Sequence, residues 1–330
     1  MKNISRKFLL FYIGAMLCMP PMAAHAASKK TQKQITAGSH FKAVKYKSSS
    51  RNKIHHRLRA QKAVAVDSYD GTTPLRLASA KAIVINQLTG ETLYAKNTNV
   101  PTPIASVTKL MTAMVMLDAQ LALDEPLSIG DQDVDYLKGT SSRLAVGTTL
   151  TRGELLQLAL MASENRAASA LGRHYPGGKP AFVQAMNNKA KLLGMQSTRF
   201  VDSTGLDSNN VSTAEDLVKM VNAAYHYPEI RQVSTLPSQE VTLFGRQNPL
   251  NFVNTNALVR GGNWIIGLSK TGFINEAGRC LVMQAEISGQ PTIIVLLDSA
   301  GKMTRIGDAN RIRKWVERND ANSLGDHVHG

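Results

Sequence analysis

The stretch "PIASVTKLMTAM", residues 103–114, places a lysine three residues after a serine where an apolar helical pattern begins. Residues three apart share one face of a helix, so the spacing predicts that Ser106 and Lys109 meet at the start of a helix over 106–121. Apolar residues cover a wide arc of this segment, which predicts that the helix is buried. Burial lowers the pKa of a lysine and lets its amine take a proton from a neighbouring serine.

A serine and a lysine at this spacing are weak as a signal on their own, because a capping serine followed by a lysine that extends to solvent is common. Two later stretches, "MASENRAAS" and "LSKTGF", strengthen the signal. They supply a Ser-x-Asn and a Lys-Thr-Gly triplet, formed by Ser163 and Asn165, and by Lys270, Thr271 and Gly272. The three motifs in this order are the signature set of penicillin-binding proteins and serine β-lactamases.

Periodicity divides the chain into an early hairpin, a central set of helices and a late set of strands. Two strand-like runs flank Thr89-Gly90, and Thr151 and Glu154 stand in the relation of a helix-starting capping box. The other predicted segments are helices at 106–121, 179–193, 213–225 and 305–318, and strands within 263–273, 279–287 and 291–300. We predict an α+β fold in which one sheet, built from distant parts of the chain, carries packed helices.

The first 26 residues have the pattern of a secretory signal peptide. A basic start precedes an apolar run over 8–19, and Ala24-His25-Ala26 predicts cleavage after Ala26. A retained membrane anchor is the alternative, but about 12 apolar residues are short for the roughly 20 that span a bilayer. Lipid attachment at Cys18 is disfavoured because Leu17, rather than a small residue, precedes it. We therefore expect export.

Basic residues are concentrated in the segment that follows. Fourteen Lys and Arg residues and no acidic residue precede Asp67, so most of the net charge of +15 lies there. Segment 27–74 is polar, with few large apolar residues, and is expected to be a disordered tail. It acts either as a tether without a specific partner or through attraction to an anionic wall or membrane surface. No nucleic-acid partner is expected, since the chain has no patch of interleaved aromatic and basic residues.

The cysteine and histidine content argues against disulfides and metal sites. After signal removal Cys280 is the only cysteine, so no internal disulfide forms, and its apolar strand-like surroundings predict a buried small hydrophobic residue. His174 lies beside a predicted turn, and the other paired histidines lie in predicted tails without a well-spaced third ligand. We expect no metal and no cofactor.

The chain from residue 80 to about 315 resembles the D-alanyl-D-alanine carboxypeptidase and endopeptidase family of low-molecular-mass penicillin-binding proteins, and most of all its endopeptidase type. The stretches that carry the resemblance are "PIASVTKLMTAMVMLDA", "LALMASENRAASAL", "HYPGGKPAFVQAMNNKAKLLGM", "TRFVDSTGL" and "KTGFINEAGRCLVM". The resemblance implies a β-lactamase/transpeptidase-like fold, with an antiparallel sheet, packed helices and a helical subdomain. It also implies a periplasmic enzyme whose catalytic domain spans 75–318, followed by a polar C-terminal tail at 319–330.

The same resemblance implies a role for each motif residue. Ser106 is expected to attack a D-alanyl carbonyl with Lys109 as its base, and Ser163 to relay a proton to the leaving amine. The expected substrate-binding residues are Asn165, Lys270, Thr271, Gly272 and Phe273, of which Phe273 offers a backbone N–H to the oxyanion. The implied substrate is the peptide stem of peptidoglycan, and β-lactams are expected to be covalent inhibitors.

Alternatives remain open at this point. An endopeptidase that cleaves crosslinks is favoured over a D-alanyl-D-alanine carboxypeptidase because no second domain or amphipathic anchoring helix follows residue 318. A class A β-lactamase needs a downstream glutamate for deacylation, and no glutamate occurs over 166–214. A non-catalytic wall-binding protein is disfavoured because every motif residue is present.

Overall fold

A computed structural model describes residues 74–243 and 248–326, with side chains described to residue 320. The predicted signal peptide at 1–26 lies outside the described residues, as does nearly all of the predicted basic tail at 27–74. Everything below refers to the described part of the chain.

The centre of the fold is a five-stranded sheet in the order β2-β1-β11-β10-β9, in which every neighbouring pair is antiparallel. Its strands are β1 (Lys81–Asn86), β2 (Thr92–Lys96), β9 (Ile265–Ile274), β10 (Gly278–Ile287) and β11 (Gln290–Ser299). The early hairpin and the three late strands predicted from the sequence are therefore confirmed. The hairpin pairs with the last strand, since Lys81 lies opposite Leu297 and Asn86 opposite Thr292.

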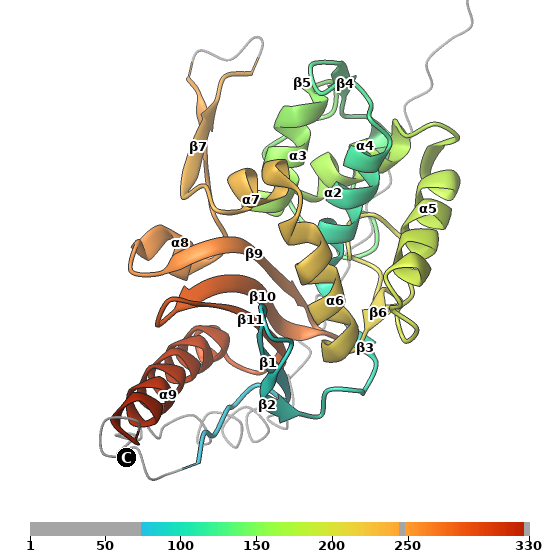
Figure 1. Cartoon of the computed structure of the whole chain (residues 1–330). Coiled ribbons are helices and arrows are strands. Elements are labelled where there is room, and N and C mark those ends of the chain that lie inside the picture. Colours follow the sequence, from blue (N-terminus) through green and yellow to red (C-terminus); the bar gives the residue numbers. More distant parts are fainter. Residues whose placement is uncertain (1–73, 244–247, 327–330) are drawn as a thin grey trace, which may run out of the picture. The chain divides into compact units, whose positions relative to one another are not determined.

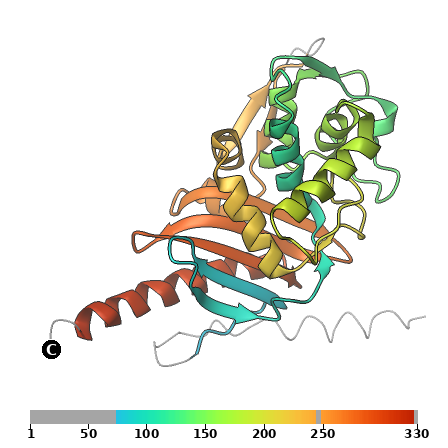
Figure 2. The same ribbon diagram turned by 45° about the vertical axis from the view of Figure 1, so that its right-hand side comes forward.

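Alternation along these strands separates two apolar layers. In β10, Val282 faces one core while Leu281 and Met283 face the other, as expected for side chains with a period of two. The second core is completed by Ile306, Ile312 and further apolar residues of α9 (Thr304–Asp326). Figures 1 and 2 show α9 on one side of the sheet and the remaining long helices on the other.

The helices on the other side surround α2 (Lys109–Asp118), whose first eight residues are all buried. This matches the wide apolar arc in the sequence. The surrounding helices are α3 (Arg152–Met161), α4 (Asn165–Arg173), α5 (Gly178–Leu192), α6 (Ala214–Tyr225) and α7 (Pro228–Ser234). α3 begins with the predicted capping box, in which the Thr151 hydroxyl accepts from the Glu154 N–H and the Glu154 carboxylate accepts from the Thr151 N–H.

Shorter elements connect these layers. They are β3 (Thr102–Pro103), η2 (Ala105–Thr108), β4 (Pro126–Ser128), η3 (Asp131–Asp133), β5 (Thr149–Thr151), β6 (Val211–Ser212), β7 (Ser238–Val241), β8 (Leu250–Val253) and α8 (Ala257–Gly261). β7 and β8 pair as a hairpin that extends away from the main sheet (Figure 1). None of the helices in the described residues is both long and apolar enough to cross a membrane.

The bounds of two predicted helices differ from the structure by more than one residue. The helix predicted over 106–121 spans Lys109–Asp118, because a single turn of 3-10 helix, η2, precedes it and the helix ends three residues earlier than predicted. The last helix continues past the predicted end at residue 318 and reaches Asp326, inside the segment predicted as a polar tail. Helix ends are set by local turns and caps, which periodicity does not encode.

Leu110→Ala should lower the free energy of unfolding by about 2–5 kcal/mol, because Leu110 is completely buried in α2 and its truncation leaves a cavity. Leu192→Ala is the matched control, since Leu192 is 83% exposed and its truncation should change stability by less than about 0.5 kcal/mol. Urea unfolding followed by circular dichroism measures both. Equal effects of the two substitutions would contradict the assignment of α2 as the centre of the core.

Candidate active site

The 3-10 turn η2 brings Ser106 and Lys109 together at the start of α2. Side chains at positions i and i+3 eclipse in a 3-10 helix, and the Lys109 Nζ lies 2.9 Å from the Ser106 Oγ. The residue before the serine, Ala105, has a left-handed backbone with φ of 48°. Strain of this kind is found where surrounding structure fixes a functional conformation.

Lys109 is completely buried, and three oxygen atoms surround its amine. Besides the Ser106 Oγ, these are the Asn165 Oδ1 at 2.8 Å and the main-chain oxygen of Thr204 at 2.6 Å. Asn165 is the first residue of α4, which places the second predicted motif directly against the first. The structure therefore brings Ser106, Lys109 and Asn165 into one cluster.

Burial lowers the pKa of Lys109 to about 7, although the carboxylates of Asp202, Glu164 and Asp135 act in the opposite direction. A lysine with such a pKa is partly a neutral amine at neutral pH. The amine therefore meets both requirements of a general base for Ser106, which are contact and a free lone pair.

A tight turn positions the Thr204 oxygen. The Asp202 carboxylate accepts from the backbone N–H groups of Thr204 and Gly205, each at 2.6 Å. Gly205 has φ of 80°, and a Cβ atom there would lie 1.9 Å from the Ala105 oxygen. Only glycine allows the turn to approach the residue before the nucleophile so closely. The Thr204 contact was not predicted from the sequence, although Thr204 lies in the stretch "TRFVDSTGL" that resembles the family.

Ser163 and Lys270 form a second pair. The Lys270 Nζ donates to the Ser163 Oγ and to the main-chain oxygen of Thr271, both at 2.9 Å. Lys270 is buried in β9, and burial, followed by the positive charges of Lys109 and Arg305, holds its pKa well below the usual range. Ser163 itself has a left-handed backbone with φ of 60°.

The remaining predicted residues continue along β9. The Thr271 hydroxyl donates to the Thr255 hydroxyl at 2.7 Å, which places the loop at 254–256 beside the strand. A Cβ atom on Gly272 would lie 2.9 Å from the Ile104 oxygen and 3.0 Å from the Ser106 nitrogen. Phe273 is half exposed, with the Arg279 guanidinium 4.3 Å above its ring.

Three further residues near the site were not found from the sequence. The Asn165 Nδ2 donates to the Thr140 Oγ1 at 2.9 Å, and the Thr140 hydroxyl donates to the Asp135 Oδ2 at 2.6 Å. Arg305, at the start of α9, is buried, and its Nε and Nη1 atoms have no hydrogen-bond partner among the described residues. No motif marks these positions. The partners of Asn165 lie on a loop about 25 residues upstream of it.

Glu164, which lies between Ser163 and Asn165, is buried. Its carboxylate accepts from the Ser142 Oγ at 2.6 Å and forms an ion pair with Arg143, whose Nε lies 3.6 Å away. Cys280 is buried as predicted, and burial raises the pKa of its thiol to about 11.

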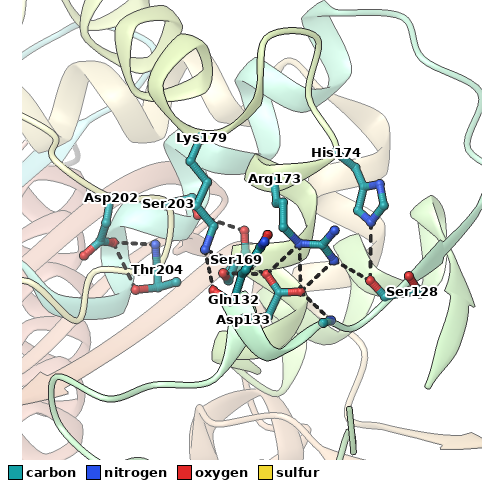
Figure 3. Close-up of polar contacts among 12 residues, drawn as sticks. Ser128, Gln132, Asp133, Ser169, Arg173, His174, Lys179, Asp202, Ser203 and Thr204 are labelled. Atoms are coloured by element: carbon teal, nitrogen blue, oxygen red, sulfur yellow. Dashed lines mark hydrogen bonds and ion pairs between the residues drawn. The ribbon is translucent and has the colours of Figure 1, made fainter. Parts of the chain in front are cut away.

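A cavity of about 270 Å³ adjoins the cluster, and Asn165 and Thr204 form part of its wall. Figure 3 shows its polar lining, in which the Asp133 carboxylate is held by Arg173 at 2.8 Å and by the Ser169 hydroxyl at 2.8 Å. Asp133 is thus neutralised. Lys179, half of whose side chain is exposed, donates to the Gln132 oxygen. The cavity therefore adjoins two of the residues that hold the Lys109 amine, and its wall includes the partly exposed Lys179, whose Nζ lies 3.9 Å from the Asp133 Oδ1.

Comparison with known proteins agrees with this geometry. Residues 65–301 match the family described as D-alanyl-D-alanine carboxypeptidase. The chain belongs to this family. It is 49% identical over 248 residues to a D-alanyl-D-alanine endopeptidase of Pseudomonas aeruginosa, over 75% of this chain and 80% of the relative. It is 48% identical over 241 residues to a D-alanyl-D-alanine endopeptidase of Escherichia coli K12, over 73% and 78%.

A solved structure of the Streptomyces K15 DD-transpeptidase superposes on this D-alanyl-D-alanine peptidase with a TM-score of 0.69 at 30% sequence identity. The match covers 74% of this chain and 98% of the other. The predicted α+β, transpeptidase-like fold and the predicted class of enzyme, a serine D-alanyl-D-alanine hydrolase, are confirmed.

Gly272→Ala should lower kcat/KM for hydrolysis of a D-alanyl peptide about tenfold to a hundredfold, because the added Cβ would press on the Ser106 nitrogen and move the nucleophile. Gly261→Ala is the control, since a Cβ atom there meets nothing within 4 Å. Chromatographic detection of product measures both. Unchanged activity of Gly272→Ala would show that the Ser106 backbone tolerates displacement.

Proposed function

We propose that this peptidase is an endopeptidase that cleaves D-alanyl crosslinks in peptidoglycan through an acyl-enzyme on Ser106. The observation that carries the proposal is the buried Lys109 amine, in contact with the Ser106 Oγ at 2.9 Å and held by Asn165 and Thr204. A lysine in this position has no evident structural purpose, because burying an ammonium among neutral oxygen partners, without a contacting carboxylate, opposes folding.

Acylation begins when the neutral Lys109 amine takes the hydroxyl proton of Ser106 as the Oγ attacks the D-alanyl carbonyl carbon. The oxyanion that forms is bound by the backbone N–H groups of Ser106 and Phe273. The intermediate then collapses, and its C–N bond breaks. The leaving nitrogen takes a proton from the Ser163 hydroxyl, and Ser163 regains one from the Lys270 Nζ that contacts it at 2.9 Å. Water then attacks the ester carbonyl and releases the acid. Lys109 returns its proton to the departing Ser106 Oγ, and the proton that the water loses passes through Ser163 to Lys270, so both lysines recover their starting states.

The substrate lies along β9. The Asn165 side chain and the Thr271 hydroxyl offer hydrogen bonds to the peptide, and Gly272 lets its backbone approach the strand. Lys270 and the buried Arg305 supply positive potential for a substrate carboxylate. Arg305 has two N–H groups without a partner among the described residues, which such a carboxylate would satisfy.

Two observations favour crosslink cleavage over removal of a terminal residue. Identity is 41–49% with three proteins named endopeptidases and 26–32% with five named carboxypeptidases. The cavity of about 270 Å³ beside Asn165 also gives a place for part of a second peptide chain, which a carboxypeptidase does not need. We keep the carboxypeptidase as the second candidate because the whole family model carries that description.

The setting we propose is the bacterial periplasm, reached through a signal peptide at 1–26. The catalytic domain spans 75–318, and the basic tail at 27–74 attaches the enzyme loosely to an anionic wall or membrane surface. Support comes from the sequence pattern and the clustering of charge at the N-terminus. β-Lactams are proposed to act as covalent inhibitors through Ser106, since they present an acylating carbonyl to the same nucleophile.

Wild-type enzyme mixed with a penicillin should gain the mass of one drug molecule and keep it for minutes, whereas Ser106→Ala should gain nothing. Intact-mass spectrometry measures both. Ser142→Ala serves as a serine control near the site and should still form the adduct. An adduct that disappears within seconds while drug is consumed would indicate a β-lactamase, and a folded protein without any adduct would contradict the catalytic reading.

The second-order rate constant of acylation by penicillin should rise with pH through an apparent pKa of about 7. The rate constant rises rather than falls because protonated Lys109 has no lone pair, and the neutral amine forms as the pH passes its lowered pKa of about 7. Lys109→Arg should abolish acylation over the whole range, since a guanidinium stays protonated. A rate independent of pH between 5 and 9 would exclude Lys109 as the base.

Crosslinked muropeptide dimers should be cut to monomers faster than pentapeptide monomers lose their terminal D-alanine. Liquid chromatography with mass detection follows both substrates in one reaction, and Ser106→Ala is the blank. Preferential release of free D-alanine would instead assign the carboxypeptidase activity.

A further inference from the structure

The side-chain amide of Asn165 stands between the proposed base and an exposed loop. Its Oδ1 accepts from the Lys109 Nζ at 2.8 Å, and its Nδ2 donates to the Thr140 Oγ1 at 2.9 Å. An amide can rotate by half a turn and exchange its oxygen and nitrogen. The partner on the loop side therefore decides which atom faces the lysine.

Thr140 is restricted to the role of acceptor. Its hydroxyl proton is committed to the Asp135 Oδ2 at 2.6 Å, so only lone pairs of the Thr140 oxygen remain to face Asn165. Although burial opposes ionisation of Asp135, hydrogen bonds from Thr140 and the backbone N–H groups of Lys138, Thr140 and Leu137 lower its pKa. An ionised carboxylate only accepts, and therefore fixes the direction of the Thr140 hydroxyl.

The orientation matters when Lys109 is neutral. A neutral amine has two N–H groups and one lone pair, and three partners surround it. Asn165 Oδ1 and the Thr204 main-chain oxygen accept the two N–H groups, which leaves the lone pair for the Ser106 hydroxyl. With the Asn165 amide reversed, its NH₂ would donate to the lone pair and occupy the atom that must receive the serine proton.

We propose that Asp135 and Thr140 are positioning residues that lock the Asn165 amide with its oxygen toward Lys109 and so keep the lysine lone pair directed at Ser106. The proposal rests on the proposed function of Ser106 and Lys109. Neither residue touches the reacting atoms, and both act through Asn165. Asp135 and Thr140 hold the Asn165 amide whether Lys109 is neutral or protonated. Without them, only the protonated form of Lys109 would keep the amide oxygen directed toward it.

The test compares Thr140→Val, which keeps the shape and removes the hydroxyl, with Thr140→Ser, which keeps the hydroxyl. Thr98→Val is the matched control: its hydroxyl likewise donates to a carboxylate, that of Glu215 at 2.5 Å, at the start of α6. The second-order rate constant of penicillin acylation is measured from pH 5 to 9 for each protein. Thermal unfolding confirms that each variant is folded.

Thr140→Val should lower the high-pH plateau about tenfold or more, because the lone pair is occupied in the reversed amide. It should also move the rising limb to lower pH by about half a unit or more. The reversed amide removes an acceptor from the ammonium form and adds a donor to the neutral form, and both changes lower the pKa of Lys109. Thr140→Ser should restore plateau and limb, and Thr98→Val should match wild type.

If Thr140 acted only by stabilising the loop, Thr140→Val should move the rising limb of the pH profile in the opposite direction. Loosening of the loop would admit water to Lys109, weaken the effect of burial, and move the limb to higher pH. Of the charged groups that act on Lys109, Asp202, Glu164 and Lys270 keep their contacts in Thr140→Val. Asp135 loses the hydroxyl contact but keeps the three backbone N–H groups that lower its pKa.

A limb that stays in place or moves to higher pH would overturn the lock, as would a Thr140→Val plateau within twofold of wild type. Failure of the proposed function is distinct from this result. In that case wild-type enzyme would form no adduct on Ser106, whereas failure of the lock alone leaves wild type and Thr140→Val acylated at similar rates.

Discussion

The ammonium group of Lys109 lies where water does not reach it, and much of the structure serves to hold it there. Burial of an unpaired charge is costly, so the fold must supply oxygen acceptors from several directions. It does so with one side chain of α4, one main-chain carbonyl of the 202–206 turn and the hydroxyl of Ser106. The left-handed backbone of Ala105, the glycine at 205 and the apolar packing of α2 are all requirements of this arrangement.

The sheet side of the site is positively charged, whereas the helical side is negatively charged. Lys270 and Arg305 lie on β9 and at the start of α9, while Asp135, Glu164 and Asp202 lie in the helical region. The three carboxylates oppose the effect of burial on Lys109, so its pKa falls to about 7 and no further. Opposite charges on the two sides produce an electric field across the site, and preorganised fields of this kind make a large contribution to catalysis in enzymes.

Sequence alone gave the elements with strong periodicity and the residues that belong to motifs. β9, β10 and β11 alternate clearly, and Ser106, Lys109, Ser163, Asn165 and Lys270 stand in motifs whose order is informative. The contact of Thr204 with Lys109 could not be predicted, because a main-chain oxygen has no sequence signature. Thr140 and Arg305 could not be predicted as site residues, because they lie on a loop and a helix far from the motifs in the sequence. Single polar residues in such segments resemble ordinary surface residues. The 3-10 turn at Ser106 depends on the turn at Gly205, a tertiary contact that periodicity does not detect.

The pairing of β1 with β11 joins residues more than 200 positions apart in the chain. Contacts of this separation make folding slow, because loop closure must precede the gain from pairing. The sheet is incomplete until the strand ending at Ser299 is available, and β9 with Lys270 belongs to the same late segment. Until then Lys109 remains hydrated and keeps the basicity of an ordinary lysine. Under the proposed mechanism, Ser106 therefore gains its base only when the domain is complete, and the emerging chain is inert toward peptides, including its own.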